Sequence, residues 1–315
     1  MSKTTDLTKR NFTRQSHVIV NARYALTRAE IDIVLTLLTA IKQEDEDFKD
    51  YQFTIKELEQ KTNRKWNSKQ LKDTIKSLMG KPLDIPKENG KGWTIVNWFS
   101  YFDYSDGGII TCRFDKVLKP YLLQIKGTRI ISDFRHLLPM QSSYSKRMYL
   151  LLKEYDKIGS RKFNIEELQD ILKVPNSHKT RYNKFKQDVL QRSEKDINKF
   201  TDLEVNFVEK KQGRKIHEVV FFIRKNNNKL KDFISNIREL YPNKVLLHTK
   251  DGRPIKCSKK GLLYYADSSN LTLDKKTAQK TWEWLHENRA NLECYEGAID
   301  EERLKRVGTD SSKLT

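Results

Sequence analysis

The chain has 315 residues, of which 37% are hydrophobic and 10% aromatic, so it is long and apolar enough to form two or three folded domains. Lys and Arg number 61 against 42 Asp and Glu, which gives a formal net charge of +19 and indicates an anionic partner. The longest apolar run, Ile31–Ile41, contains Asp32 and is too short to span a bilayer. Nucleic acid is therefore favoured over a membrane as that partner.

The sequence has none of the motifs for secretion, metal binding or catalysis. Its first 15 residues include no apolar stretch of the kind a secretory signal requires. Cys112, Cys257 and Cys294 are widely spaced without a C-x-x-C pair, which predicts neither a disulfide framework nor a zinc site and suits a reducing cytosol. The six histidines are scattered and no phosphate-binding loop occurs, so we expect no enzyme activity, no metal and no cofactor.

The positive charge is concentrated in one part of the chain. Residues 126–225 carry 23 basic against 13 acidic side chains, a surplus of +10, whereas residues 20–125 carry 17 against 15, a surplus of +2. A uniformly basic surface would not produce this asymmetry. The sequence therefore predicts that residues 126–225 form the main phosphate-binding body.

Residues 20–125 show the element order of a winged helix-turn-helix. Thr27 and Glu30 form a capping-box pattern ahead of an apolar helix that ends near Ile41, and Thr54 and Glu57 repeat the pattern ahead of a short helix 55–61. A third helix is predicted over 68–79, and two alternating apolar runs, 93–102 and 109–114, predict the hairpin that follows.

The same order recurs in residues 126–225. A helix is predicted from Ser142/Ser143 to Asp156, Asn164 caps a second helix 165–172, and a turn at 174–179 leads into a long helix of about 180–200. Strands 203–209 and 216–223 then flank a basic loop. We therefore predict an α+β protein with tandem winged-helix domains. The expected parts are a flexible segment 1–19, domain 1 over 20–125, domain 2 over 126–225, and a linker with a small C-terminal region over 226–315.

The predicted helix 180–200 carries the strongest DNA-binding pattern. Tyr182, Phe185, Val189, Ile197 and Phe200 share its core face at 100° per residue. The opposite face is then rich in amide and basic side chains, which pair with adenine and guanine edges in the major groove. We expect base contacts from Thr180, Asn183, Lys184, Gln187, Gln191 and Lys195, and phosphate contacts from Lys179 and Arg181 at the start of the helix. An ordinary solvated helix face is the alternative.

Further basic residues are candidates for backbone contacts. The loop 210–215 places Lys210, Lys211, Arg214 and Lys215 around Gly213 and is typical of a wing that lies along DNA; a merely solubilising loop is the alternative. Ser143, Lys146 and Arg147 open a helix and are weaker candidates for a phosphate clamp. In the first unit, Lys69, Lys72 and Lys76 project outward and suit either DNA backbone contact or a protein–protein surface.

Several blocks of the sequence, in order, resemble the iteron-binding plasmid replication initiators of the RepE-like (Rep_3) family. The resemblance covers about residues 18–225 and rests on the ordered set rather than on any single block. The blocks are Asn21–Thr27 (NARYALT), Leu118–Leu122 (LKPYL), Ser143–Leu152 (SYSKRMYLLL), Phe163–Leu168 (FNIEEL), Tyr182–Leu190 (YNKFKQDVL), Lys195–Asn198 (KDIN), Gly213–Ile216 (GRKI) and Phe221–Ile223 (FFI).

The resemblance implies two winged-helix domains related by pseudo-two-fold symmetry, and it implies a function as well. Members of this family bind origin direct repeats (iterons) as monomers, with the second domain reading bases and the first contacting the backbone. They also dimerise through the first domain and repress their own gene at an operator inverted repeat. They help to melt the origin and bring in host DnaA and the replicative helicase. By position, base reading falls on residues 180–191 and the wing on 210–215.

Two other functions are compatible with parts of the sequence. A dimeric winged-helix transcriptional repressor would have the same fold without an initiator role. A metal-dependent rolling-circle nickase would need a His cluster that this sequence lacks.

Residues 226–315 depart from the family pattern: 230–240 is predicted as a helix, 245–256 as a hairpin, and Trp282, Trp284 and Leu285 lie on a further helix. Contact with a helicase and packing against domain 2 are both open as roles for this region.

Overall fold

The computed structural model divides into two compact units, residues 1–225 and residues 226–315. The residues that the structure describes are 11–42, 45–87, 91–105, 108–123, 125, 129–226, 234, 245–249, 252–258, 262–267 and 270–287.

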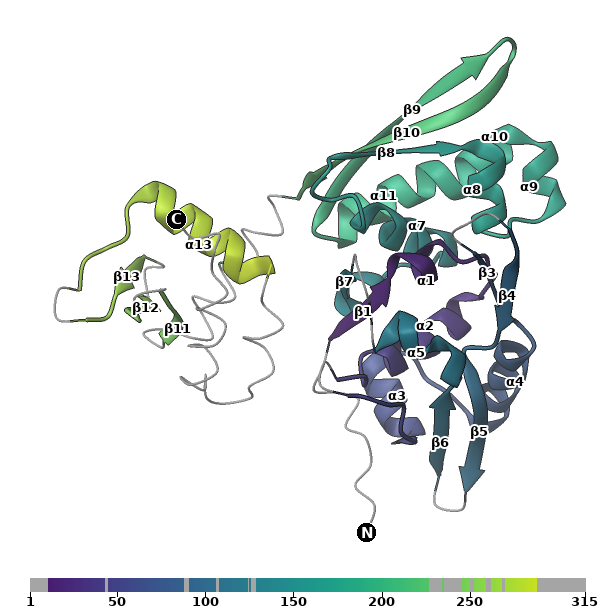
Figure 1. Cartoon of the computed structure of the whole chain (residues 1–315), viewed down its shortest axis with the longest axis horizontal. Helices are drawn as coiled ribbons and strands as arrows, with labels where there is room; N and C mark the ends of the chain where they lie inside the picture. The colour runs from purple at the N-terminus through teal and green to yellow at the C-terminus, as the bar shows by residue number, and fades with distance from the viewer. Residues whose placement is uncertain are drawn as a thin grey trace. The chain divides into compact units, whose positions relative to one another are not determined.

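The first half of the larger unit is a winged helix (Figure 1). Its three helices precede a hairpin whose strands join an earlier strand in an antiparallel sheet of order β2-β6-β5. The helices are α2 (Arg28–Leu38), α3 (Ile55–Thr62) and α4 (Ser68–Met79), and the strands are β2 (Tyr51–Thr54), β5 (Phe99–Ser105) and β6 (Ile109–Phe114).

Local sequence accounts for where these helices begin. The Thr27 hydroxyl accepts from the backbone N–H of Glu30, whose carboxylate accepts in return from the N–H of Thr27, so the predicted capping box is present at α2. Thr54 and Glu57 form the same reciprocal pair at α3. Asn67, rather than Ser68, caps α4. Each cap satisfies backbone donors that the first turn of a helix leaves without partners.

The second half repeats this architecture. Its sheet order, β8-β10-β9, matches β2-β6-β5 element for element, and a helix capped by Asn164 takes the place of α3. The predicted tandem winged-helix fold is therefore confirmed. The elements are α7 (Ser143–Lys153), β8 (Ser160–Asn164), α8 (Ile165–Ile171), α9 (Asn176–Thr180), α10 (Tyr182–Phe185), a π-helix η2 (Lys186–Gln191), α11 (Arg192–Phe200), β9 (Leu203–Gln212) and β10 (Lys215–Lys225).

Two features of the larger unit differ from the sequence-based prediction. Residues 12–19, expected to be flexible, form strand β1 (Phe12–Ser16) and the start of helix α1 (His17–Asn21). β1 pairs with β7 (Arg129–Asp133), so the N-terminal segment is tied to the chain between the two winged helices. The predicted strand 93–102 is two strands, because β4 (Trp93–Val96) pairs with β3 (Leu83–Pro86) in a separate hairpin. The segment that connects the two winged helices also contains the short helices η1 (Lys116–Leu118), α5 (Lys119–Leu122) and α6 (Phe134–Leu137).

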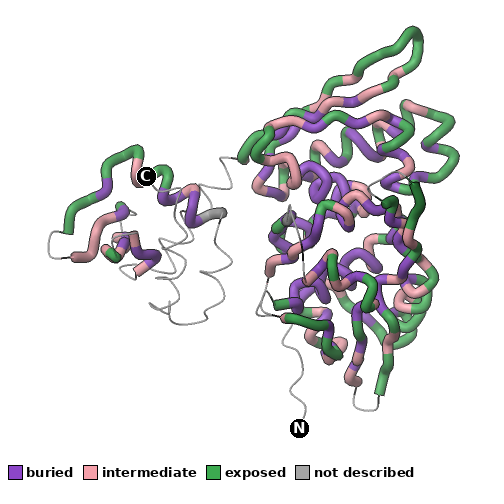
Figure 2. The backbone as a smooth tube through the Cα atoms, in the orientation of Figure 1, coloured by how far each residue is buried: buried purple, intermediate pink, exposed green. Residues whose placement is uncertain are grey.

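One hydrophobic core runs through both winged helices. Buried side chains from α2, such as Ile33 and Leu37, belong to the same cluster as Met148, Leu151 and their neighbours in α7. Figure 2 shows buried backbone through the centre of this unit and exposed backbone along its rim and hairpin ends. Because the two halves share a core, their surfaces keep a fixed relation within this unit.

In the described residues, the smaller unit contains a three-stranded antiparallel sheet of order β11-β12-β13 and the helix α13. The elements are β11 (Val245–His248), β12 (Pro254–Cys257), β13 (Leu263–Tyr265) and α13 (Lys275–Glu287). Trp282, Trp284 and Leu285 of α13 are buried in its core with Leu246 and Leu247 of the sheet. The hairpin and the tryptophan-bearing helix agree with the prediction, whereas the expected helix 230–240 lies outside the described residues apart from residue 234. Among the described residues, no helix is long and apolar enough to cross a membrane.

Candidate nucleic-acid interface

The predicted helix 180–200 is present but is not one regular helix. It begins earlier than predicted, with α9, and it bends at Arg181, whose backbone dihedrals of φ −118° and ψ 88° lie outside the helical region. After the bend, the chain continues through α10, the π-helix 186–191 and α11. A π-turn inserts an extra residue and often marks a functional site. The assumption of a constant 100° per residue across 180–200 is therefore wrong, because both the bend and the π-turn change the helical phase.

The side chains of this segment that were predicted to face DNA are nevertheless all exposed. They come from four successive elements of what we call the recognition element, residues 176–200. The exposed set is Lys179 and Thr180 at the end of α9, Arg181 at the bend, Asn183 and Lys184 in α10, Gln187 and Gln191 in the π-helix, and Lys195 in α11. The buried side includes Phe185, Val189 and Ile197, as expected. It also includes Leu190 and Ser193, which were not predicted to lie on that side from a helix of 100° per residue.

A side-chain contact spans the bend in the recognition element. His178 Nε2 lies 3.1 Å from Asp188 Oδ2, across the ten residues that contain Arg181, and the His178 ring packs against Tyr144 at 6.3 Å between centroids. His178 is buried, while Asp188 is half-exposed. Sequence analysis missed this pair because nothing in a regular helix brings positions 178 and 188 together.

The predicted wing is the end of the β9–β10 hairpin, which Figure 1 shows running on past β8. Pairing of β8 with β10 ends at Asn164 opposite Glu218, whereas pairing of β9 with β10 continues to Gln212 opposite Lys215. Gly213 turns the chain at φ +62°, where an L side chain would be strained. The four wing cations, Lys210, Lys211, Arg214 and Lys215, are all exposed.

One carboxylate joins the wing to the recognition element. Glu209 of β9 accepts hydrogen bonds from Tyr182 Oη at 2.6 Å and from Lys186 Nζ at 2.9 Å. Burial by itself raises the pKa of Glu209, but these two donors outweigh it and hold the pKa below its ordinary value. Sequence analysis did not identify Glu209, because its partners lie 27 and 23 residues away.

The proposed phosphate clamp at the start of α7 is wrong. Lys146 has no exposed side-chain surface and its ammonium pairs with the buried carboxylate of Asp32 in α2. Arg147 is also buried, between the Tyr24 ring and the carbonyl oxygens of Ala22 and Ile171. Ser143 is half-buried. These two cations stabilise the junction of the winged helices and cannot reach a phosphate.

Other polar contacts reinforce the same junction. Glu154, directly after α7, accepts from Asn21 Nδ2 at 3.0 Å and from Arg161 Nη1 at 2.9 Å, and it also pairs with His17. Asp170 of α8 pairs with Arg23. These contacts join residues that precede α2 to the second winged helix, so they favour one arrangement of the two halves.

In the first winged helix, the predicted lysines are exposed along α4. Lys69, Lys72 and Lys76 line the rim of a groove between α4 and the β5–β6 hairpin, whose floor includes Ile75 and Phe102. This groove between the third helix and the hairpin of the first winged helix is apolar. At the equivalent place in the second winged helix, the polar contacts of Glu209 join the recognition element to the hairpin. The two halves therefore share a fold but present different chemistry beside their third helices.

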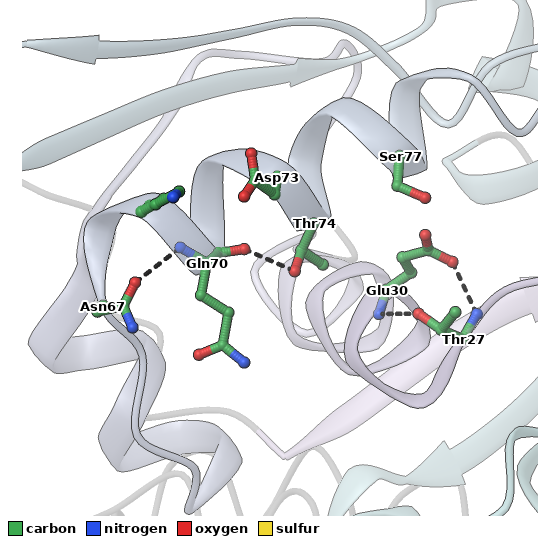
Figure 3. Close-up of a pocket in the computed structure, with 8 residues that line it drawn as sticks. Thr27, Glu30, Asn67, Gln70, Asp73, Thr74 and Ser77 are labelled. Carbon is green, nitrogen blue, oxygen red and sulfur yellow. Dashed lines mark hydrogen bonds between the residues drawn. The ribbon is translucent and has the colours of Figure 1, made fainter.

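The other side of α4 borders an open polar depression (Figure 3). Asn67, Gln70, Asp73, Thr74 and Ser77 line it from α4, opposite the capping box at the start of α2. The Glu30 carboxylate accepts from Lys81 Nζ at 2.8 Å, so this acid is neutralised within the fold. Among the described residues, no group of three or more His, Cys, Asp or Glu side chains could hold a metal ion.

Two winged helices on a shared core, one with an exposed polar and cationic recognition element and a cationic wing, define a tandem winged-helix DNA-binding protein. Among solved structures, the chain is similar to one described as "Crystal structure of Pi initiator protein in complex with iteron DNA". The two are 19% identical with a TM-score of 0.55, over 68% of this chain and 98% of that chain. At this identity the match supports the fold.

Two family models match along the chain. One, described as "Initiator Replication protein, WH1", matches residues 13–153, and the other, described as "Initiator Rep protein, WH2", matches residues 164–223. Together they cover well over half of the 315 residues, so the chain belongs to the Rep initiator replication protein family, which consists of non-catalytic DNA-binding proteins. The boundary between the models lies after α7, later than the boundary at 125/126 that the charge distribution suggested.

Proposed function

We propose that this protein binds direct repeats (iterons) of a plasmid origin as a monomer and starts replication there. The observation that carries the proposal is the side-by-side placement, on the second winged helix, of the recognition element and the wing. Both are exposed, both are cationic, and Glu209 bonds one to the other. A helix for the major groove with a basic hairpin for the adjoining backbone is how winged helices engage duplex DNA.

Within the recognition element, the amide and lysine side chains suit base edges. Asn183, Gln187 and Gln191 can each pair with adenine through two hydrogen bonds, and Lys184 can donate to guanine N7 and O6. Lys179, Arg181 and Lys195 have no ion-pair partner among the described residues, so their charge is available to phosphates. Thr180 donates to the Asn176 carbonyl oxygen and lies at the bend.

The wing and the first winged helix would supply backbone contacts. Lys210, Lys211, Arg214 and Lys215 are exposed on a hairpin that runs beyond the rest of the sheet, so phosphates can approach them. Lys69, Lys72 and Lys76 form an exposed row on α4, the counterpart of the recognition element in the first half. Their neighbour Asp73 makes close reading of bases less favourable than backbone contact.

The first winged helix also offers a surface for self-association. On β4, the side chains of Trp93 and Ile95 are 66% and 56% exposed, and β3 is the only strand that pairs with β4 among the described residues. An exposed apolar edge strand is a template for pairing with another chain. We propose that a dimer formed here binds an operator inverted repeat and represses the protein's own gene. We further propose that the protein melts the origin and recruits host DnaA and the replicative helicase in the bacterial cytoplasm; family membership supports these proposals.

The test is footprinting on the DNA that flanks the gene, combined with sizing of the bound protein by analytical ultracentrifugation. We expect protection of several direct repeats, each by one copy of the chain. Protection of a lone inverted repeat by a dimer, with no protected direct repeat, would instead establish a dimeric transcriptional repressor. Mutating the flanking repeats one at a time should remove protection one repeat at a time if monomers bind them.

A further inference from the structure

The wing has little besides its own hydrogen bonds to fix its direction. β8 stops supporting β10 at Glu218, and beyond that point the hairpin is a two-stranded ribbon. Such ribbons are marginally stable alone and twist readily. A β-bulge at His217, between the pairs Ile216–Lys211 and Glu218–Lys210, adds a bend at the base of the wing.

Glu209 lies at the point where the ribbon leaves the core. Leu203, Val205 and Phe207 alternate along β9 on the side that faces the helices, and Glu209 continues this series after the last apolar residue. Its carboxylate bonds to Tyr182 in α10 and to Lys186 at the start of the π-helix. At the bulge itself, His217 Nε2 lies 3.2 Å from Nδ2 of Asn164, the residue that caps α8.

A carboxylate at this place is unfavourable for DNA binding taken by itself. Phosphates that contact the wing and the recognition element would lie on either side of Glu209, and like charges repel. A role in geometry explains why an acid occurs among so many cations. Its side chain is 22% exposed and accepts two donors from an element that must keep a defined distance from the wing.

We propose that Glu209 is a positioning residue that sets the angle between the wing and the recognition element through Tyr182 and Lys186, so that both can engage one DNA site. The inference rests on the proposed function, because it concerns how the same interface fits duplex DNA. It predicts that removing an acid from this surface weakens specific binding, which is the opposite of what charge alone predicts.

The experiment compares Glu209→Ala with Glu204→Ala in the full chain. Glu204 is exposed on the same strand and has no ion pair among the described residues, so its removal changes the charge alone. Tyr182→Phe is the third variant, because it removes one donor to Glu209 without altering the net charge. Binding is measured by fluorescence anisotropy on a duplex with one direct repeat from the flanking DNA and on a scrambled duplex, with hydroxyl-radical footprints of the first.

We expect Glu204→Ala to leave affinity for the repeat unchanged or to raise it by up to about twofold. Glu209→Ala should lower that affinity by about fivefold to tenfold, with Tyr182→Phe in the same direction but smaller. For Glu209→Ala and for Tyr182→Phe, the footprint on the DNA backbone next to the wing should weaken. The slope of log K against log salt should fall by about 1 to 2, because wing contacts are lost although the lysines remain. Melting temperatures should stay close to that of the wild type.

Equal gains in affinity for Glu209→Ala and Glu204→Ala, with an unchanged footprint, would overturn the positioning role while leaving the proposed function intact. A wild-type protein that binds the repeat and the scrambled duplex equally would contradict the proposed function instead. In that case the salt slopes of the two alanine variants on the scrambled duplex still decide the positioning role, since they count wing contacts with any DNA.

Discussion

The guanidinium carbon of Arg147 lies 3.4 Å from the centre of the Tyr24 ring, and its Nη2 donates to the carbonyl oxygens of Ala22 at 2.7 Å and Ile171 at 3.3 Å. Arg147 belongs to α7, Ala22 and Tyr24 precede α2, and Ile171 ends α8. One buried side chain therefore joins three segments from both winged helices. Burial lowers the pKa of Arg147, and the ring and carbonyl oxygens stabilise the cation in return.

Replacing Arg147 with Ala should destabilise the junction of the winged helices. The change removes the cation–π contact and leaves buried carbonyl oxygens without their donor, so we expect a loss of about 3 kcal/mol in the free energy of unfolding, measured with urea. Arg181→Ala is the matched control, because Arg181 is exposed and should change stability by less than about 0.5 kcal/mol. Equal stability of the two variants would contradict this role for Arg147.

Replacing Gln187 with Ala should reduce discrimination between DNA sites. The amide can pair bidentately with one adenine, so its loss should remove about 1–3 kcal/mol of preference for the correct base at one position of the repeat. The measurement is binding to a set of duplexes that vary one base at a time. Gln60→Ala, exposed on α3 of the first winged helix, should leave the preferences unchanged. If Gln187→Ala also leaves every base preference intact, the π-helix does not face the bases.

Lys211→Ala should instead weaken binding to all sequences alike. Lys211 is an exposed wing cation, and one lost phosphate contact lowers the slope of log K against log salt by about 1. Titrations at several salt concentrations on specific and scrambled duplexes measure this. Lys56→Ala, which removes an exposed lysine from α3, serves as the charge control. A loss confined to the repeat duplex would assign Lys211 to base recognition.

Asp202 should make stability depend on acid pH. It accepts from Tyr149 Oη and Lys153 Nζ, each at 2.9 Å, and lies 3.2 Å from His136 Nδ1. Burial by itself raises the pKa of Asp202, but Lys153 and His136 outweigh it and hold the pKa well below its ordinary value. The unfolded chain therefore takes up this proton first as the pH falls, so the stabilisation is complete above about pH 4 and is lost below it.

Asp202→Asn removes that dependence. We expect the variant to be about 2 kcal/mol less stable than the wild type at pH 7, with the difference shrinking as the pH falls below about 4. Urea unfolding at pH 7, 5, 4 and 3 gives both curves. A difference that stays constant over this range would show that Asp202 is not charged in the folded state.

The exposed side chains of β4 should control self-association. Trp93→Ser combined with Ile95→Ser removes the apolar surface from the edge strand, so the fraction of dimer measured by sedimentation should fall. Tyr104→Ser is the control, since Tyr104 is 57% exposed but lies on β5, in the β5–β6 hairpin of the same winged helix. A dimer that is lost with Tyr104→Ser and kept in the double variant would move the interface to the β5–β6 hairpin.

Local sequence patterns predicted much of the fold. The capping boxes at Thr27 and Thr54 were identified from residues three apart, and the structure contains both. Short-range hydrogen bonds of this kind depend on neighbours in the chain, so they can be read without the fold. The recognition element was also predicted from a local pattern, the helical spacing of its apolar residues, but its bend and its π-turn were not predicted. The contacts between His178 and Asp188, and between Glu209 and both Tyr182 and Lys186, were not predicted either, because they join residues that no regular helical or strand spacing brings together.

The amino-acid sequence by itself determined the order of elements, the concentration of charge in residues 126–225 and the polar character of the recognition element. Only the tertiary structure decided which cations are available to DNA. Lys146 and Arg147 match a phosphate clamp in sequence, yet they are buried against Asp32 and Tyr24, whereas Lys184 and Lys211 are exposed. The physical reason is that a charge enters the core only where partners from distant segments compensate its desolvation, and composition does not reveal those partners.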